Sequence, residues 1–190
     1  IKGATLAAQK NEDYLEVLKE LENNHFNIIK ELLPVKEQSS VNGYVKQLFN
    51  HLETIYEGCF LLRELSPKTL AKVSSFGELL SSYIISQAAN ESFKAVYKDT
   101  RELIVASDNY NNALVDFSAT FKNCQEYFSS RSQKVTIVPG FVARTINGKT
   151  TTLGRGGSDF TAAIISAALD CSELQIWTDV SGMFTANPSI

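Results

Sequence analysis

Apolar residues in the first half of the chain recur at the spacing of an α-helix. One stripe advances in alternating steps of four and three residues: Val41, Val45, Leu48, Leu52, Ile55, Cys59 and Leu62. Such a stripe occupies one face of a helix, and the intervening Lys46 and Glu53 point elsewhere. A coiled coil has the same period, but three heptads without a clear scheme of flanking charges favour a single helix that faces the core.

Shorter apolar periods predict further helices on both sides of this stripe. Residues 15–21 and residues 26–33 each carry an apolar face, and Pro34 ends the second. Ser66-Pro67 supplies a cap and a first-turn proline for another helix. We expect that helix to break or restart at residues 76–78, the sequence Phe-Gly-Glu, because glycine weakens helices.

The second half of the chain changes to short β-type runs separated by helical stretches. The expected strands are residues 93–97, 102–106, 134–138 and 174–177, and the expected helices are residues 117–128 and 161–169. Strands that alternate with helices indicate an α/β fold with a mostly parallel sheet. Trp177 lies inside the last of these strands, so we expect it in the core.

One segment predicts a hairpin instead. Residues 140–145 and 149–153 flank Asn147-Gly148, a dipeptide that is typical of a two-residue β-turn. The expected antiparallel pair interrupts an otherwise parallel arrangement.

Composition and charge exclude several classes of protein. The 190 residues are 44% apolar and 21% charged, which suits a globular chain. A formal net charge of −3 gives no electrostatic footprint for nucleic acid or for an anionic membrane. Three widely spaced cysteines favour a reducing compartment over a disulfide frame or a metal cluster. With no signal peptide, no spanning apolar run and no initiator Met, we expect a piece of a cytoplasmic protein.

The strongest candidate for chemistry is a glycine-rich loop that opens a helix. Residues 150–159 read TTTLGRGGSD and lead into an Ala-rich apolar run. The glycines allow close approach of the backbone, Ser158 is a candidate cap, and Asp159 falls in the first turn. Arg155 and the amides of that turn favour an anion. The alternative is an ordinary β-to-α turn with a solvated arginine.

These residues, together with the downstream run IWTDVSGMFTANP of residues 176–188, resemble the aspartokinases of the amino-acid kinase superfamily. The second motif suits the bifunctional aspartokinase/homoserine dehydrogenases. Residues 75–81, SFGELLS, resemble the Gly-Glu helix start of the family. The resemblance implies a three-layer αβα sandwich of the amino-acid kinase type, truncated at both ends. It also implies transfer of the ATP γ-phosphate to the side-chain carboxylate of L-aspartate, the first step of lysine, threonine and methionine biosynthesis.

The resemblance implies a site for the amino acid. Both substrates are anions, so cations, oriented amides and in-line positioning must do the work. Arg155 would pair with a carboxylate of aspartate, beside amides and a hydroxyl from Gly156, Gly157 and Ser158. Glu78 would hold the substrate ammonium, and Phe141 falls where the family has a Phe in its aspartate site. The alternatives are a helix-start glutamate and an aromatic ring that packs within a strand.

Further residues are implied for catalysis and for the nucleotide. Asp159 would organise the catalytic lysine of the family, which belongs to a Lys-Phe-Gly-Gly loop that these residues lack. Thr178 and Asp179 resemble the nucleotide-binding Thr-Asp, and Phe184 stands where many relatives have Tyr. Residues 187–189 read Asn-Pro-Ser where the family has Asp-Pro-Arg, so an arginine expected near the phosphates is missing.

The resemblance also sets expectations for organisation and partners. Residues 1–190 would be part of one kinase domain, helical over 1–90 and α/β over 91–190, and inactive as a kinase alone. ATP would enter as its Mg²⁺ complex, with no metal site on the protein, and NADP would be used only if a homoserine dehydrogenase half follows. Open sheet edges predict a homo-oligomer. The alternatives are a kinase for glutamate or acetylglutamate and a non-catalytic ligand-binding module.

Overall fold

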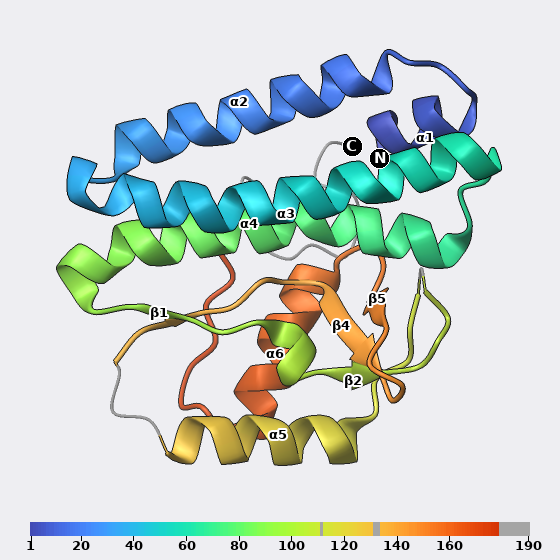
Figure 1. Cartoon of the computed structure of the whole chain (residues 1–190). Coiled ribbons are helices and arrows are strands. Elements are labelled where there is room, and N and C mark those ends of the chain that lie inside the picture. The colour runs from blue at the N-terminus through green and yellow to red at the C-terminus, as the bar shows by residue number, and fades with distance from the viewer. Residues whose placement is uncertain (111, 131–133, 179–190) are drawn as a thin grey trace, which may run out of the picture.

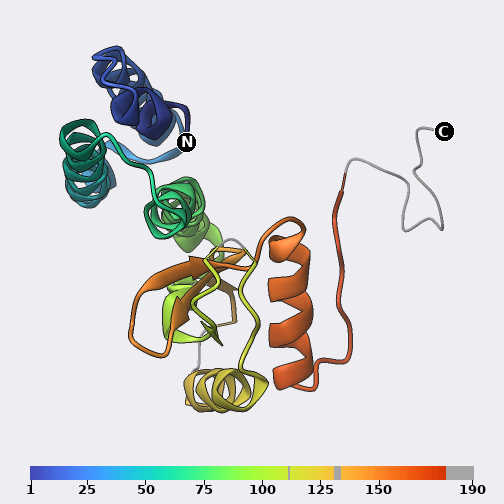
Figure 2. The same cartoon turned by 90° about the vertical axis from the view of Figure 1, so that its right-hand side faces the viewer.

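Four helices precede the strands in a computed structural model that describes residues 1–110, 112–130 and 134–178. They are α1 (Lys2–Ala8), α2 (Tyr14–Leu32), α3 (Val35–Leu62) and α4 (Pro67–Phe93). In Figures 1 and 2 α4 lies between α3 and the strands, while α1 and α2 cover the far side of α3. The helical part therefore reaches the sheets through α4.

The apolar stripe of α3 faces a core, as predicted. Residues buried on this helix are Val41, Val45, Phe49, Leu52, Tyr56 and Cys59. Leu62, the last member of the predicted stripe, is 76% exposed. A straight helix has 3.6 residues per turn, so a stripe spaced at 3.5 drifts along it, and Phe49 and Tyr56 are buried in place of Leu48 and Ile55. The helix packs against α1, α2 and α4, which confirms the core-facing interpretation.

Two predicted helix boundaries are wrong. The apolar runs 15–21 and 26–33 do not form two helices: α2 includes both as far as Leu32, and Leu33 follows its end. The Ser66 hydroxyl accepts a hydrogen bond from the amide of Thr69 at 3.2 Å, so the predicted cap of α4 is confirmed. However, α4 continues through residues 76–78 without a break. One interior glycine costs about 1 kcal/mol, and burial of Phe76 and its apolar neighbours outweighs that cost.

Two small sheets lie between α4 and the last two helices. The strands β1 (Val96–Tyr97) and β3 (Thr136–Ile137) pair in parallel. In the second sheet β4 (Val142–Thr145) pairs in parallel with β2 (Val105–Ala106) and antiparallel with β5 (Thr150–Thr152). The helix α5 (Phe117–Ser129) lies on the side of the strands away from α4, and α6 (Gly157–Ala168) runs beside the strands from near α4 to α5 (Figures 1 and 2). Helices thus flank mostly parallel strands, which confirms the predicted α/β class.

The hairpin forms, but its turn differs from the prediction. The amide of Gly148 donates to the Thr145 carbonyl at 2.9 Å, and the amide of Thr145 donates to the Lys149 carbonyl at 2.8 Å. Of the turn residues only Gly148 has a positive φ, +73°. A two-residue type I′ turn needs positive φ at both positions, whereas a turn followed by one left-handed glycine closes a three-residue loop. The loop therefore comprises residues 146–148.

The predicted strand at residues 174–177 is wrong. Residues 173–178 have no regular secondary structure, and within the described residues they join neither sheet. Trp177 is 89% exposed instead of lying in the core. Its indole Nε1 donates at 3.2 Å to the side chain of Gln175, a local contact. A strand needs a partner edge, and apolar composition alone does not supply one.

Two hydrophobic cores hold the described residues together. One is formed by α1 to α4, and the other by α5, α6 and the strands. Cys59 lies in the first core and Cys124 in the second, and neither is in a disulfide. Burial raises the pKa of both thiols. Among the described helices, none combines the length and apolar character required to cross a membrane.

Candidate functional site

Three segments that are distant in the sequence meet at Gly140. The carboxylate Oε1 of Glu78, in the middle of α4, accepts a hydrogen bond from the Gly140 amide at 3.1 Å. On the other side, a Cβ at Gly140 would lie 2.6 Å from the Ser158 hydroxyl of α6. Only a glycine fits between these neighbours. The loop from β3 to β4 is therefore held between α4 and the start of α6.

Phe141, the next residue, has an unusual backbone. Its φ is +48°, in the left-handed region that side chains other than glycine rarely adopt. Its amide donates to the hydroxyl of Thr161 at 3.0 Å, and its carbonyl accepts from the Leu153 amide at 2.9 Å. A Cβ at Gly157 would lie 2.6 Å from the Phe141 Cβ. Such backbone strain costs about 1–3 kcal/mol and clusters at functional sites.

The glycine-rich loop opens α6, but not with the predicted cap. Gly156 is the N-cap, with φ +73°, and no side chain caps the helix. Ser158 does not cap because it already lies inside the first turn, where its hydroxyl packs against Gly140. Asp159 occupies the first turn, as predicted, and Arg155 is exposed. The first amides of a helix carry a partial positive charge. This loop therefore places two positive groups close together in sequence, the exposed Arg155 and the N-terminus of α6.

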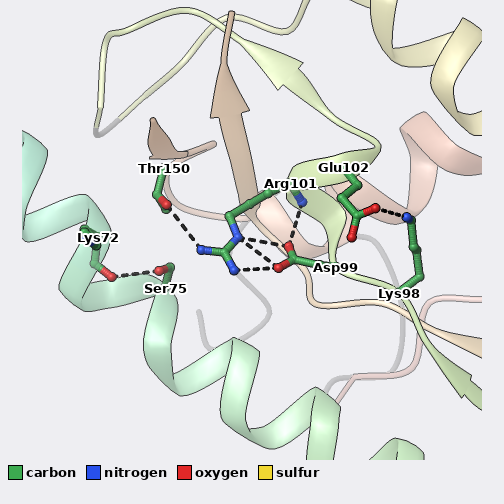
Figure 3. A network of polar contacts seen from close by, with 7 residues as sticks. All are labelled: Lys72, Ser75, Lys98, Asp99, Arg101, Glu102 and Thr150. Atoms are coloured by element: carbon green, nitrogen blue, oxygen red, sulfur yellow. Dashed lines mark hydrogen bonds and ion pairs between the residues drawn. The ribbon is translucent and has the colours of Figure 1, made fainter. Parts of the chain in front are cut away.

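An arginine network supports the strand that leads into this loop (Figure 3). The Arg101 guanidinium donates to the Asp99 carboxylate through Nε at 3.0 Å and Nη2 at 2.5 Å, and Nη1 donates to the Thr150 hydroxyl at 3.4 Å. Burial alone would lower the pKa of Arg101, but the hydrogen bonds and charge of Asp99 raise it above its ordinary value. Arg101 thus remains a fixed cation that ties η1 (Thr100–Glu102) to the start of β5.

A cavity of about 460 Å³ lies beside the site but differs from it in character. Its walls come mainly from apolar side chains of α2, α3 and α4, and Phe141 borders it. Glu78 and Arg155 do not line it. A zwitterionic ligand would lose its hydration there and find no carboxylate or guanidinium side chain on the walls. The loops around Gly140, which offer charges and amides, suit such a ligand better.

The structure brings some of the predicted residues together and leaves others apart. Glu78, Phe141, Gly157 and Ser158 all contact the same loop or its immediate neighbours. Glu78 is not at a helix start, which corrects that interpretation: it lies within the 27 residues of α4. Thr178 is exposed and lies on no strand, contrary to expectation. Asp179, Phe184 and residues 187–189 lie outside the described residues.

Sequence reasoning missed Gly140 and Thr161. The signal for Gly140 was available, because Pro139-Gly140 precedes the hairpin and marks a tight connection. Thr161 gave no such signal, since a threonine inside an Ala-rich helix resembles ordinary packing. Among the described residues, no cluster of His, Cys, Asp and Glu has the grouping needed to hold a metal ion.

Helices that flank mostly parallel strands, with a glycine-rich β-to-α loop that opens a helix, define an α/β domain. Residues 6–190 match the model of the Amino acid kinase family, and the chain belongs to this family.

Within this family, the chain is similar in sequence to aspartokinases. The chain is 33% identical over 185 residues to the bifunctional aspartokinase/homoserine dehydrogenase of Buchnera aphidicola, covering 94% of this chain and 22% of that protein. It is 30% identical over 177 residues to the lysine-sensitive aspartokinase 3 of Escherichia coli, covering 92% of this chain and 38% of the relative.

Solved structures show the same fold. Escherichia coli aspartokinase III in complex with aspartate and ADP superposes with a TM-score of 0.87 at 28% identity, covering 99% of this chain and 42% of that one. The complex of the same enzyme with lysine and aspartate gives a TM-score of 0.85 at 27% identity and covers the same shares. These relatives confirm the resemblance to aspartokinases, and this chain spans less than half of each of them.

Proposed function

We propose that the chain forms part of an aspartate kinase and supplies the binding site for the amino acid. The reaction would transfer the ATP γ-phosphate to the side-chain carboxylate of L-aspartate. Support comes from the family match and from relatives named as aspartokinases. It also comes from the likeness to a solved enzyme whose complex holds aspartate and ADP.

The observation that carries this proposal is the meeting of Glu78, Phe141 and the glycine-rich loop around Gly140. Glu78 presents a carboxylate from mid-helix, where the helix dipole offers it no stabilisation. A carboxylate in that place serves to hold the Gly140 amide through one oxygen, and in our proposal it holds the substrate ammonium as well. Arg155, exposed on the adjacent loop, would pair with a substrate carboxylate through its planar fork.

The proposed chemistry needs no protein nucleophile. A side-chain oxygen of aspartate attacks the γ-phosphorus, a new P–O bond forms, and the bond to the β-phosphate oxygen breaks to release ADP. The first amides of α6, with Gly156, Gly157 and Ser158, would stabilise negative charge that builds up between the two anions. Asp159 would orient a lysine that is supplied from elsewhere in the protein. Mg²⁺ would arrive bound to ATP, as part of the substrate.

The nucleotide part of the site rests on resemblance. We assign Thr178, Asp179 and Phe184 to the ATP site because of the Thr-Asp motif and the aromatic residue after it. Ser189, in the place of an arginine of the family, would weaken phosphate contacts there.

Organisation and location are also proposals. Residues 1–190 would act as part of one kinase domain, helical over 1–90 and α/β over 91–190, in a homo-oligomer. A role for NADP would require a homoserine dehydrogenase half. A cytoplasmic location suits cysteines that form no disulfide, as found for Cys59, Cys124 and Cys171. Sedimentation of the purified protein measures the oligomeric state, and a strictly monomeric particle would contradict that part.

The decisive experiment measures acyl phosphate formation by the full protein that carries this chain. With ATP and Mg²⁺, L-aspartate is expected to give a product that hydroxylamine traps as a hydroxamate. Glutamate and N-acetylglutamate are the competing substrates, and a higher kcat/KM for either would overturn the assignment to aspartate. Absence of transfer to all three acceptors would favour the non-catalytic ligand-binding module.

A further inference from the structure

We infer that Thr161 is a positioning residue, whose buried hydroxyl holds the Phe141 backbone in its left-handed conformation and so shapes the site for the amino acid. The effect on aspartate rests on the proposed function. The effect on the Phe141 backbone does not, and the experiment below separates the two.

The hydroxyl of Thr161 acts both as a hydrogen-bond donor and as a hydrogen-bond acceptor. Its hydrogen points to the carbonyl of Gly157 one turn earlier, at 2.7 Å. Its oxygen can then only accept, and it accepts from the Phe141 amide at 3.0 Å. Thr161 is 2% exposed, so solvent offers neither group a replacement partner.

Phe141 needs this support because its conformation is unfavourable by itself. A φ of +48° strains a residue that has a Cβ. The hydrogen bond to Thr161 offsets part of this strain, and the close approach of Gly157 leaves the Phe141 Cβ little room to shift. Without the hydroxyl, the Phe141 amide would lose its partner in a half-buried place, and relaxation toward negative φ would become favourable.

Two successive backbone amides are held by two different helices. Glu78 of α4 accepts from Gly140, and Thr161 of α6 accepts from Phe141. The two peptide units on either side of the Gly140 Cα are therefore each held by a different helix. A change at Thr161 reaches Glu78 across the one residue Gly140, which couples α6 to the residue that we assign to the substrate ammonium.

The test compares three substitutions in the full protein. Thr161→Val keeps the branched shape and removes the hydroxyl, whereas Thr161→Ser keeps the hydroxyl. Thr120→Val is the matched control: Thr120 is also buried, and its hydroxyl bonds the Val105 amide at 3.1 Å and the Val105 carbonyl at 3.3 Å, in β2. Thr120→Val removes the same hydroxyl group from a buried position that makes no hydrogen bond to Phe141.

Amide exchange and kinetics give separate readouts. In Thr161→Val, hydrogen exchange at the Phe141 amide is expected to speed up and the KM for aspartate to rise about tenfold, with the KM for ATP unchanged. In Thr161→Ser, the exchange rate at the Phe141 amide and the KM for aspartate should stay close to those of the wild-type protein. Thr120→Val should lower stability but change neither the exchange rate at Phe141 nor the KM for aspartate.

Two results would overturn the inference. One is an unchanged rate of hydrogen exchange at the Phe141 amide in Thr161→Val, and the other is an equal change of that rate in Thr161→Val and Thr161→Ser. Faster exchange with an unchanged response to aspartate would overturn the link to the substrate. If the wild-type protein does not phosphorylate aspartate, the proposed function fails, and exchange at Phe141 still decides whether Thr161 positions the backbone.

Discussion

The Glu78 carboxylate and the Gly140 amide are joined by a hydrogen bond of 3.1 Å across 62 positions of sequence. This contact connects the helical part of the chain to the loop between β3 and β4. It uses one carboxylate oxygen, and no described residue donates a hydrogen bond to the other. A single side chain can therefore fix a backbone amide and still face a ligand, which is the arrangement that our assignment of Glu78 requires.

Glu78→Gln tests that assignment in the full protein. The amide oxygen of glutamine can still accept from Gly140, so we expect the melting temperature to change little. Loss of the charge should lower kcat/KM for aspartate by roughly tens- to a hundredfold while the KM for ATP stays the same. Glu57→Gln, which changes an exposed glutamate of α3, is the control. An unaltered response to aspartate would show that Glu78 is purely structural.

Arg155→Lys tests the shape of the cation as well as its charge. Arg155 is exposed, so its replacement should leave the free energy of unfolding nearly unchanged. A lysine cannot reproduce two parallel hydrogen bonds to a carboxylate, and we expect aspartate binding to recover only in part relative to Arg155→Met. Steady-state kinetics with aspartate varied at saturating ATP make the comparison. Full activity of both variants would place the carboxylate elsewhere.

Three glycine-to-alanine substitutions should change the free energy of unfolding in different directions. Gly140→Ala and Gly157→Ala place a methyl 2.6 Å from Ser158 and Phe141 atoms, so both should destabilise the fold and weaken aspartate binding. At Gly77 nothing lies within 4 Å of an added Cβ. Gly77→Ala should therefore stabilise α4 by about 0.5–1 kcal/mol. Urea denaturation measures all three, and equal effects would contradict the close packing around Gly140.

His51 should make stability depend on pH. Burial lowers its pKa most, followed by the charges of Lys72 and Arg101. The Lys72 Nζ lies 2.9 Å from His51 Nε2, which suits a neutral ring. The unfolded chain thus binds a proton more readily than the folded one, and stability should fall as the pH drops below about 6.5. His51→Gln should flatten this part of the curve, and Lys72→Met should reduce its slope. Thermal melts from pH 5 to 8 provide the measurement.

Local patterns predicted the elements of this fold better than their ends. The α3 stripe, the Ser66 cap and the hairpin were visible because each depends on residues within a few positions of one another. The continuity of α4 was not visible, since burial of Phe76 outweighs the local cost of Gly77. The strand expected at residues 174–177 failed because pairing depends on a partner that the local sequence does not specify.

The candidate site divides in the same way. The glycine-rich loop and Arg155 follow from a local motif, and so does Asp159 in the first turn of α6. The hydrogen bonds of Glu78 and Thr161 connect α4 and α6 to the loop between β3 and β4, and so join residues far apart in sequence. The N-cap of α6 was wrongly assigned to Ser158. The N-cap is Gly156, which begins the helix without a capping side chain, and Ser158 packs against Gly140 instead.

The exposure of Trp177 has a practical consequence. It is the single tryptophan of the chain and is 89% exposed, so indole emission reports on the segment after α6 and not on either hydrophobic core. Its neighbour Thr178 belongs to the motif that we assign to the nucleotide. The protein therefore carries an intrinsic optical probe at that position, and a shift of its emission to shorter wavelength would signal that a ligand or another protein surface has excluded water from the indole.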